Sequence, residues 1–349
     1  MNKITKILLV LLTSVSVSLS FNAIAGELSV TGSAKASYVI GGDNNGGKGL
    51  GISNEIGLGA TGELDNGMAW NYKIMLDPNA GGTVDNDDQT LTLGTDYGTV
   101  GMFISTGGLS QELAYGIGAN GTGFDFASPM TVVTGYDVSS YSNIQYHTPS
   151  GLLPFGVQVK AGFVPNLASS ADSADFKTKG VQNDQNMGSS GKMYQISSKP
   201  VDGLNVSAAY FETSSAIYKQ APTSGELAAS YTMGAFKVGA ATGYRDVGMT
   251  NKVGITNYET DSMGVQFAVN DSLSLSYSVD KSTASTRANI VSAATRAVKT
   301  SVESEITSAQ VAYNIGGATL GITRTEVDNS DYTANRNEDM TLFTLAMAF

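Results

Sequence analysis

Apolar and polar residues alternate one by one along most of this chain, and a period of two is typical of β-strands whose two faces meet different surroundings. One face of the segment 27–40 carries Leu28, Val30, Gly32, Ala34, Ala36, Tyr38 and Ile40. The other face carries Ser29, Thr31, Ser33, Lys35 and Ser37. The same alternation recurs in the segments 68–76, 155–163, 227–233, 236–244, 263–269, 273–279 and 339–349. The pattern predicts an all-β protein whose strands have one apolar face and one small or polar face.

The connections between these segments alternate between short and long. The short ones lie at Asp65–Gly67, Tyr97–Gly98, Ser150–Pro154, Pro200–Gly203, Gly234–Ala235, Asn270–Asp271 and Gly316–Gly317. The long polar ones are Gly41–Gly49, Asp77–Asp88, Gly107–Ser140, Asn166–Gly191, Glu212–Gly225, Asp246–Asn257, Lys281–Ser301 and Val327–Glu338. Seven short and eight long connections in strict alternation predict sixteen strands, with the first and last strand ending on the short-turn side.

A closed antiparallel β-barrel that crosses a membrane accounts for both patterns. Lipid offers the backbone no hydrogen bonds, so strands there must close without a free edge, and such barrels have short turns on one side and long loops on the other. Sixteen strands leave a water-filled interior, whereas eight would be filled by side chains. Two alternatives are a β-propeller, which would show a periodic aromatic or Trp-Asp signature, and a β-sandwich adhesin, whose turns would be comparable at both ends.

The beginning of the chain predicts export. Lys3 and Lys6 precede an uncharged apolar run from Ile7 to Leu19, and Ala23-Ile-Ala25 matches a small-x-small cleavage site. We therefore expect residues 1–25 to be a secretory signal peptide and residues 26–349 to form the barrel. A membrane anchor is the alternative, but a spanning helix needs about 20 apolar residues, and this run is shorter and contains Ser and Thr.

Composition narrows the class further. The chain has 41% hydrophobic and 15% charged residues, 41 Gly and no Cys, so disulfides and thiolate chemistry are excluded. Without Lys3 and Lys6 it carries 18 basic against 31 acidic side chains, a net charge of −13. Nucleic acid as a partner is disfavoured, because its phosphates require a basic surface. The acidic loops suit solubility, attraction of cations, or bridging to lipopolysaccharide through divalent ions.

Several segments carry a resemblance to a known family. In residues 339–349, Thr341, Phe343, Leu345, Met347 and Phe349 occupy every second position, an ending that resembles the closing strand of bacterial outer-membrane barrels. The segments Gly51–Met68, Leu93–Met102 and Ser142–Pro149 resemble, respectively, the second strand with its turn, the turn before the constriction loop, and the segment after that loop in Gram-negative general porins. The resemblance covers the whole chain after the signal peptide, and the family is sixteen-stranded and trimeric.

The resemblance implies that the third long loop, Gly107–Ser140, bends into the barrel and narrows it. Family members oppose carboxylates on this loop to basic residues on the facing wall. The loop carries Glu112, Asp125 and Asp137. Alternation places four charged residues on the facing inner wall: Lys35, Lys73, Lys160 and Glu55. No Arg precedes Arg245, so the arginine cluster of the family is missing, and we expect a weakly selective, mildly cation-preferring pore or one tuned to a substrate.

Catalysis is not expected. Enzymes among outer-membrane barrels generally use a His as a base, and His147, the only His, stands alone at an inward position. No Gly-x-Ser-x-Gly motif and no His/Cys set for zinc is present. The acidic run Asp85–Asp88 lacks the Gly and distal Glu of an EF-hand loop, so it predicts no cofactor and at most incidental Ca²⁺ binding or a latch to a neighbouring subunit.

Three functions remain open. The first is passive diffusion of small hydrophilic solutes and ions through an outer-membrane pore reached by Sec export through the periplasm. The others are a substrate-specific channel and a structural or adhesive barrel with surface-exposed loops. We expect a homotrimer with a contact at the small outward residues Gly32, Ala34 and Ala36. Further expected partners are membrane lipid, lipopolysaccharide and, through Phe349, the barrel assembly machinery.

Overall fold

The computed structural model of the 349-residue chain describes residues 27–41, 47–78, 84–109, 115–119, 135–136, 142–165, 167, 190–214, 221–247, 254–287 and 299–349. The proposed signal peptide, residues 1–25, lies outside the described residues. Within the described ranges no helix is both long and apolar enough to cross a bilayer.

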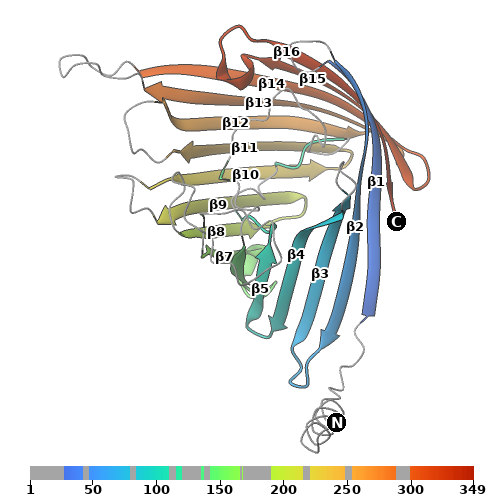
Figure 1. Ribbon diagram of the computed structural model, residues 1–349, viewed down its shortest axis with the longest axis vertical. Coiled ribbons are helices and arrows are strands. Elements are labelled where there is room, and N and C mark those ends of the chain that lie inside the picture. The colour runs from blue at the N-terminus through green and yellow to red at the C-terminus, as the bar shows by residue number, and fades with distance from the viewer. Residues whose placement is uncertain are drawn as a thin grey trace, which may run out of the picture.

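Sixteen strands form one closed barrel in which every neighbouring pair is antiparallel and β1 pairs with β16 (Figure 1). The strands are β1 (Glu27–Gly41), β2 (Lys48–Glu63), β3 (Ala69–Pro78), β4 (Val84–Thr95), β5 (Gly98–Ile104), β6 (Asn143–His147), β7 (Gln158–Val164), β8 (Ser190–Ser198), β9 (Leu204–Ser214), β10 (Thr223–Met233), β11 (Phe236–Asp246), β12 (Gly254–Ala268), β13 (Leu273–Arg287), β14 (Lys299–Asn314), β15 (Ala318–Asp328) and β16 (Glu338–Ala348). Among the described residues, two short 3-10 helices lie between strands, η1 (Pro154–Gly156) and η2 (Ser330–Tyr332). The predicted strand number and closure are confirmed.

The seven predicted short turns all join consecutive strands on one side of the barrel. In the turn between β2 and β3, the Asn66 side chain accepts a hydrogen bond from Met68 N, and Gly67 has a φ of +82°. In the turn between β12 and β13, Asn270 Oδ1 accepts from the backbone N–H groups of Ser272 and Leu273. Asn and Gly suit such turns, because Asn bonds its own backbone and Gly tolerates positive φ.

Alternation assigns the two faces of the wall as predicted. On β12, Met263 is 60% exposed while Ser262 is 7% exposed, and the same contrast holds on β13 for Tyr277 and Ser278. The exposed apolar side chains face the surrounding membrane, because a barrel in lipid presents an apolar band outward. The small and polar side chains therefore face the interior.

Strands β13 and β14 extend further than the sequence pattern predicted. Residues 281–301 were expected to be a loop, yet β13 runs to Arg287 and β14 begins at Lys299. The apolar outward residues end near Val279, but the backbone pairing continues, and Lys281 on the outer face forms an ion pair of 2.7 Å with Glu305. Loss of the apolar period therefore marks where the strands leave the apolar band of the membrane and not where pairing ends.

The barrel closes at Gly32 and Phe349. Gly32 N donates to Phe349 O at 2.8 Å, and Phe349 N donates to Gly32 O at 2.9 Å. A Cβ atom on Gly32 would lie 2.4 Å from the Phe349 ring, so glycine at this point of β1 leaves room for the ring in its observed position. This confirms the predicted pairing of the last strand with the first.

Candidate pore and its lining

The first described part of the connection between β5 and β6 is attached to the inner wall by inward amide side chains. Three of them donate to loop carbonyls: Asn143 Nδ2 to Thr106 O at 3.0 Å, Gln145 Nε2 to Gly107 O, and Gln195 Nε2 to Leu109 O at 3.2 Å. All three amides are buried. Since their strands present them to the interior, the loop runs inside the barrel at this point.

An apolar cluster lies beneath this attachment, although the inner face is otherwise mostly polar. Its buried members are Leu109, Tyr136, Val164, Leu167, Met193 and Phe211. Leu109 and Tyr136 come from the connection between β5 and β6, and the others from β7, β8, β9 and residue 167, just after β7. Burying apolar side chains contributes roughly 1.5–3 kcal/mol each, so this cluster holds both ends of the third loop against one side of the wall.

Residues 115–119 of the third loop contact β12 and β13. Tyr115 OH donates to Asp280 Oδ1 at 2.9 Å, and Ala119 N donates to Ser276 Oγ at 2.8 Å. Gly118 N donates to Gln266 Oε1 at 3.4 Å. The wall groups are at inward positions of β12 and β13, as the exposure of their neighbours shows. The described residues 115–119 therefore lie on the far inner wall, as the resemblance implied for a constriction loop.

Two glycines of the wall make this approach possible. A Cβ atom on Gly239 would lie 2.2 Å from Tyr115 O, and one on Gly264 would lie 2.8 Å from Ile117 Cγ2. Real Cβ contacts are longer than this, so any side chain at Gly239 would displace the loop backbone. Glycine in a strand often marks a site where another backbone comes close.

The end of the loop is held by β10 and β11. Gly135 N donates to Glu226 Oε1 at 2.8 Å, and Tyr136 N donates to Ser224 Oγ at 3.1 Å. The guanidinium carbon of Arg245 lies 4.2 Å from the centre of the Tyr136 ring, within cation–π range. Two charged side chains of the wall are thus engaged by the loop.

The Tyr115 hydroxyl stays protonated over an extended pH range. Burial raises the pKa of this phenol above its ordinary value of 10.0, and the neighbouring Asp280 carboxylate raises it further. A protonated phenol can donate to the carboxylate, whereas a phenolate would repel it. The contact between Tyr115 and Asp280 is therefore stable at neutral pH.

The predicted wall residues lie where alternation placed them. Lys35, Glu55, Lys73 and Lys160 occupy inward positions on β1, β2, β3 and β7, with Lys73 exposed and the other three half-buried. The predicted loop carboxylates Glu112, Asp125 and Asp137 lie outside the described residues. Their distances to the charged residues of the wall are therefore not part of the described structure. The roles of all seven residues at the constriction stay predictions.

The sequence analysis missed the charged wall residues that contact the loop. Glu226, Arg245 and Asp280 bind it directly, and Lys237 Nζ lies 2.7 Å from the position of a Cβ atom on Gly116. The signal was present for Lys237, because it alternates with the outward residues Phe236 and Val238. What alternation could not supply is which inward residues the loop reaches.

His147 is part of the wall. Its Nε2 lies 2.7 Å from Gln145 Oε1, and its ring stacks on Phe103 at a centroid distance of 6.0 Å. For the acidic run Asp85–Asp88, the side chains of residues 85–87 lie outside the described part of the chain. Within the described part, no group of three or more His, Cys, Asp or Glu side chains could hold a metal ion.

The comparisons with known proteins agree with this geometry. A family model described as Gram-negative porin matches residues 9–331. Among solved structures, an anion-selective porin from Comamonas acidovorans aligns with a TM-score of 0.64 and 12% identity, covering 93% of this chain and 100% of that one. OmpT of Vibrio cholerae in its trimer form aligns at 0.62 and 12% identity, covering 93% and 100% of the two chains.

A third solved structure, Salmonella typhi OmpF in complex with daunomycin, aligns with a TM-score of 0.62 and 12% identity, covering 93% of this chain and 98% of that one. At such identities these structures show the fold. A comparison with curated protein sequences finds no match. The family match spans nearly the whole chain, and the closed barrel with its inward loop agrees with it, so this chain belongs to the Gram-negative porin family and forms an outer-membrane porin channel.

Proposed function

We propose that the channel serves passive diffusion of small hydrophilic solutes and ions. The observation that supports this most directly is the third loop, whose described segments lie on the inner wall of a closed sixteen-stranded barrel. Purified protein in planar bilayers should give a large, unsaturated single-channel conductance. Proteoliposomes should swell fastest in the smallest sugars, and an absence of any conductance would favour the structural or adhesive alternative.

We further propose a mild preference for cations. Without Lys3 and Lys6 the chain carries a net charge of −13, which enriches cations near the mouth within a Debye length of about 8 Å. The inward residues Lys35, Lys73 and Lys160 oppose this effect inside the barrel, so the preference should be small. A reversal potential in a KCl gradient measures it, and a value that favours chloride would contradict the proposal. Conductance that saturates with one solute would favour the substrate-specific alternative.

We also propose a homotrimer that assembles through the outer face of β1, β2 and β16. Leu50 and Ile52 are 84% and 72% exposed there, beside the small outward residues Ala34 and Ala36. A groove of about 770 Å³ lies over Ala36 and is lined mainly by apolar side chains. The V. cholerae OmpT structure is a trimer form, which supports the idea by analogy. Ile52→Arg should convert a heat-sensitive trimer band on SDS gels into monomer.

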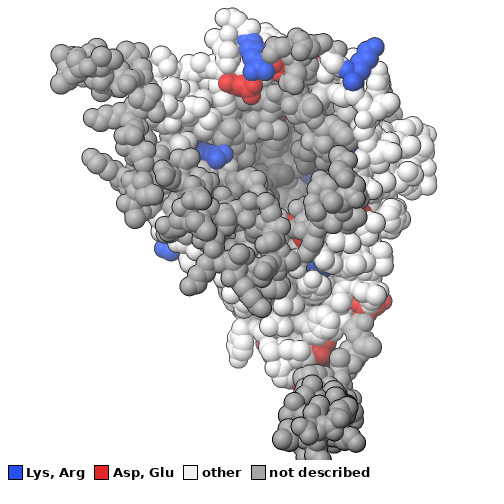
Figure 2. All heavy atoms as spheres, viewed as in Figure 1, with Lys and Arg blue, Asp and Glu red and all other residues white. Residues whose placement is uncertain are grey.

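Lipopolysaccharide is the partner we propose for the outer ends of β13–β16. Outward-facing carboxylates and bases meet there, with Arg324 Nη2 lying 2.6 Å from Asp339 Oδ2 and Lys281 paired to Glu305. Figure 2 shows charged side chains of both signs at the upper edge, where Figure 1 places β15 and β16. Because the protein carboxylates and the lipid phosphates are both negatively charged, divalent cations would have to bridge them. Chelation of these cations by EDTA should therefore release bound lipopolysaccharide.

Export and assembly complete the proposal. Residues 1–25 would be removed during Sec export, so amino-terminal sequencing of the membrane-inserted protein should begin at Gly26. Phe349 would be read by the barrel assembly machinery. We propose no enzymatic activity, because the inward His147 is held in the channel wall by Gln145 and Phe103.

A further inference from the structure

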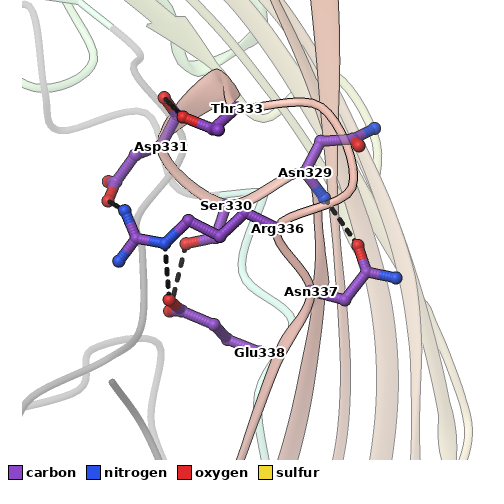
Figure 3. A network of polar contacts seen from close by, with 7 residues as sticks. All are labelled: Asn329, Ser330, Asp331, Thr333, Arg336, Asn337 and Glu338. Atoms are coloured by element: carbon purple, nitrogen blue, oxygen red, sulfur yellow. Dashed lines mark hydrogen bonds and ion pairs between the residues drawn. The ribbon is translucent and has the colours of Figure 1, made fainter. Parts of the chain in front are cut away.

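The eighth loop, residues 329–337 between β15 and β16, is fastened by a network of charged and polar side chains (Figure 3). Arg336 Nε lies 2.8 Å from Glu338 Oε1, and Arg336 Nη1 lies 2.6 Å from Asp331 Oδ2. Ser330 Oγ donates to Glu338 Oε2 at 3.1 Å. The Glu338 side chain is only 4% exposed, so this carboxylate and its partners form an interior junction. Breaking a buried charged pair is costly, since it leaves one charge uncompensated.

The backbone of the loop is tightly defined. Asn329, Asp331, Tyr332 and Asn335 all have positive φ, between 52° and 64°, although none is glycine. Such conformations persist only when surrounding contacts determine them. Two backbone hydrogen bonds are among these contacts. Ser330 N donates to Arg336 O at 2.6 Å, and Arg336 N donates to Thr333 O at 3.1 Å.

Tyr332 turns into the barrel. Its hydroxyl lies 2.8 Å from Ser282 Oγ, its ring lies 5.2 Å from the ring of Tyr258, and it packs against Ile306 and Val327. These four partners stand at inward positions of four consecutive strands, β12 to β15. The loop therefore folds over the inner wall at the external end of the barrel and does not project outward from the rim.

Both inward loops use the same strand. Asp280 receives Tyr115 of the third loop, and Ser282 receives Tyr332 of the eighth loop. The two wall residues are successive inward positions of β13, about 7 Å apart along a strand. The inward polar residues of β13 thus bind two loops: Asp280 binds the third loop, and Ser282 binds the eighth loop at the next inward position along the strand.

We propose that the eighth loop is a second restriction of the channel, placed at the external mouth and fixed by Tyr332 and the Arg336–Glu338 pair. Solutes then pass Tyr332 and Asp331 before they reach the third loop. The Asp331 side chain is 56% exposed and that of Arg336 29% exposed, so a carboxylate held beside a guanidinium faces the entrance. The restriction acts on solute size first, because loop atoms occupy part of the opening.

The test removes the loop from a folded channel. A variant with residues 330–336 replaced by two glycines should raise single-channel conductance at least about 1.5-fold, because pore width governs conduction. It should also raise the swelling rate for trisaccharides relative to monosaccharides, and Tyr332→Ala should show part of both effects. Tyr97→Ala, in a short turn at the opposite end, is the matched control and should change neither. A folded loop-deleted channel with wild-type conductance and sugar ratio would overturn the proposal.

A second measurement does not require the deletion to fold. The chain has no Cys, so Ala334→Cys provides a unique thiol in the loop. A cationic thiosulfonate reagent added on the external side should reduce the current of this variant and leave Val201→Cys, in a short turn at the other end, unchanged. Unaltered current through a fully labelled Ala334→Cys channel would refute the inward placement. A wild-type protein without any current would instead contradict the channel function itself.

Discussion

The inner wall has two regions with one sequence pattern and different surroundings. On β1 and β3 the inward residues Thr31 and Lys73 are exposed, whereas on β13 and β14 the inward residues Ser282 and Ser304 are fully buried. The described parts of the third and eighth loops make hydrogen bonds to inward side chains of β12 and β13. The comparison indicates that the water-filled path runs beside β1–β3, while the opposite wall serves as a support for loops.

Phe349 lies where these two regions meet, and its removal should have the largest effect. Its backbone pairs with Gly32, and its ring occupies the space that this glycine leaves free. Deletion of Phe349 should therefore impair closure and assembly, measured as loss of the heat-modifiable folded band in outer membranes. Normal assembly of the deletion variant would contradict a role of Phe349 in barrel closure. Met347→Leu serves as the control.

A side chain at Gly239 should displace the third loop from the supporting wall. Gly239→Val places atoms within reach of Tyr115 O, and overpacking of this kind costs typically about 1–3 kcal/mol. We expect lower stability in urea and a noisier, altered conductance. Ala240→Val changes the neighbouring outward residue and should have little effect. Equal stability and conductance of the two variants would contradict the assignment of Gly239 to the inner face and Ala240 to the outer face.

Loss of the Tyr115 hydroxyl should loosen the same loop more gently. Tyr115→Phe removes the phenol as a donor to the Asp280 carboxylate and leaves it the hydrogen bond with Ser262, and a lost buried hydrogen bond costs roughly 1–3 kcal/mol. Because the folded pKa of Tyr115 is raised, its contribution to stability is complete below pH 10 and is lost only as pH rises through the folded pKa. Current noise recorded from pH 6 to 9 should be flat in the wild type, and Tyr97→Phe is the control.

A charge reversal on the open wall should change selectivity without changing stability. Lys73→Glu removes an exposed inward cation, so the cation-to-anion permeability ratio should rise by about twofold. Lys281→Glu reverses an outward charge paired with Glu305 and should leave the ratio unchanged. A shift in the second variant but not the first would place the conducting path elsewhere.

Much of the fold could be predicted, because its determinants are local. The sixteen strands, the seven turns and the inward positions of Lys35, Glu55, Lys73 and Lys160 follow from a period of two, which lipid on one side and water on the other impose. The pairing of Phe349 with Gly32 follows from closure. The extension of β13 to Arg287 could not be predicted, since pairing continues on polar residues after the apolar signal ends.

The sequence by itself determined the barrel, its strand number and which side chains face inward, because each of these depends on neighbours along the chain. Only the tertiary structure decided where the loops lie. The contacts Tyr115–Asp280 and Tyr332–Ser282 join residues 165 and 50 positions apart, and no local pattern encodes them. The open wall beside β1–β3 and the supporting wall at β13 therefore became distinct only once the loops were placed on the inner wall.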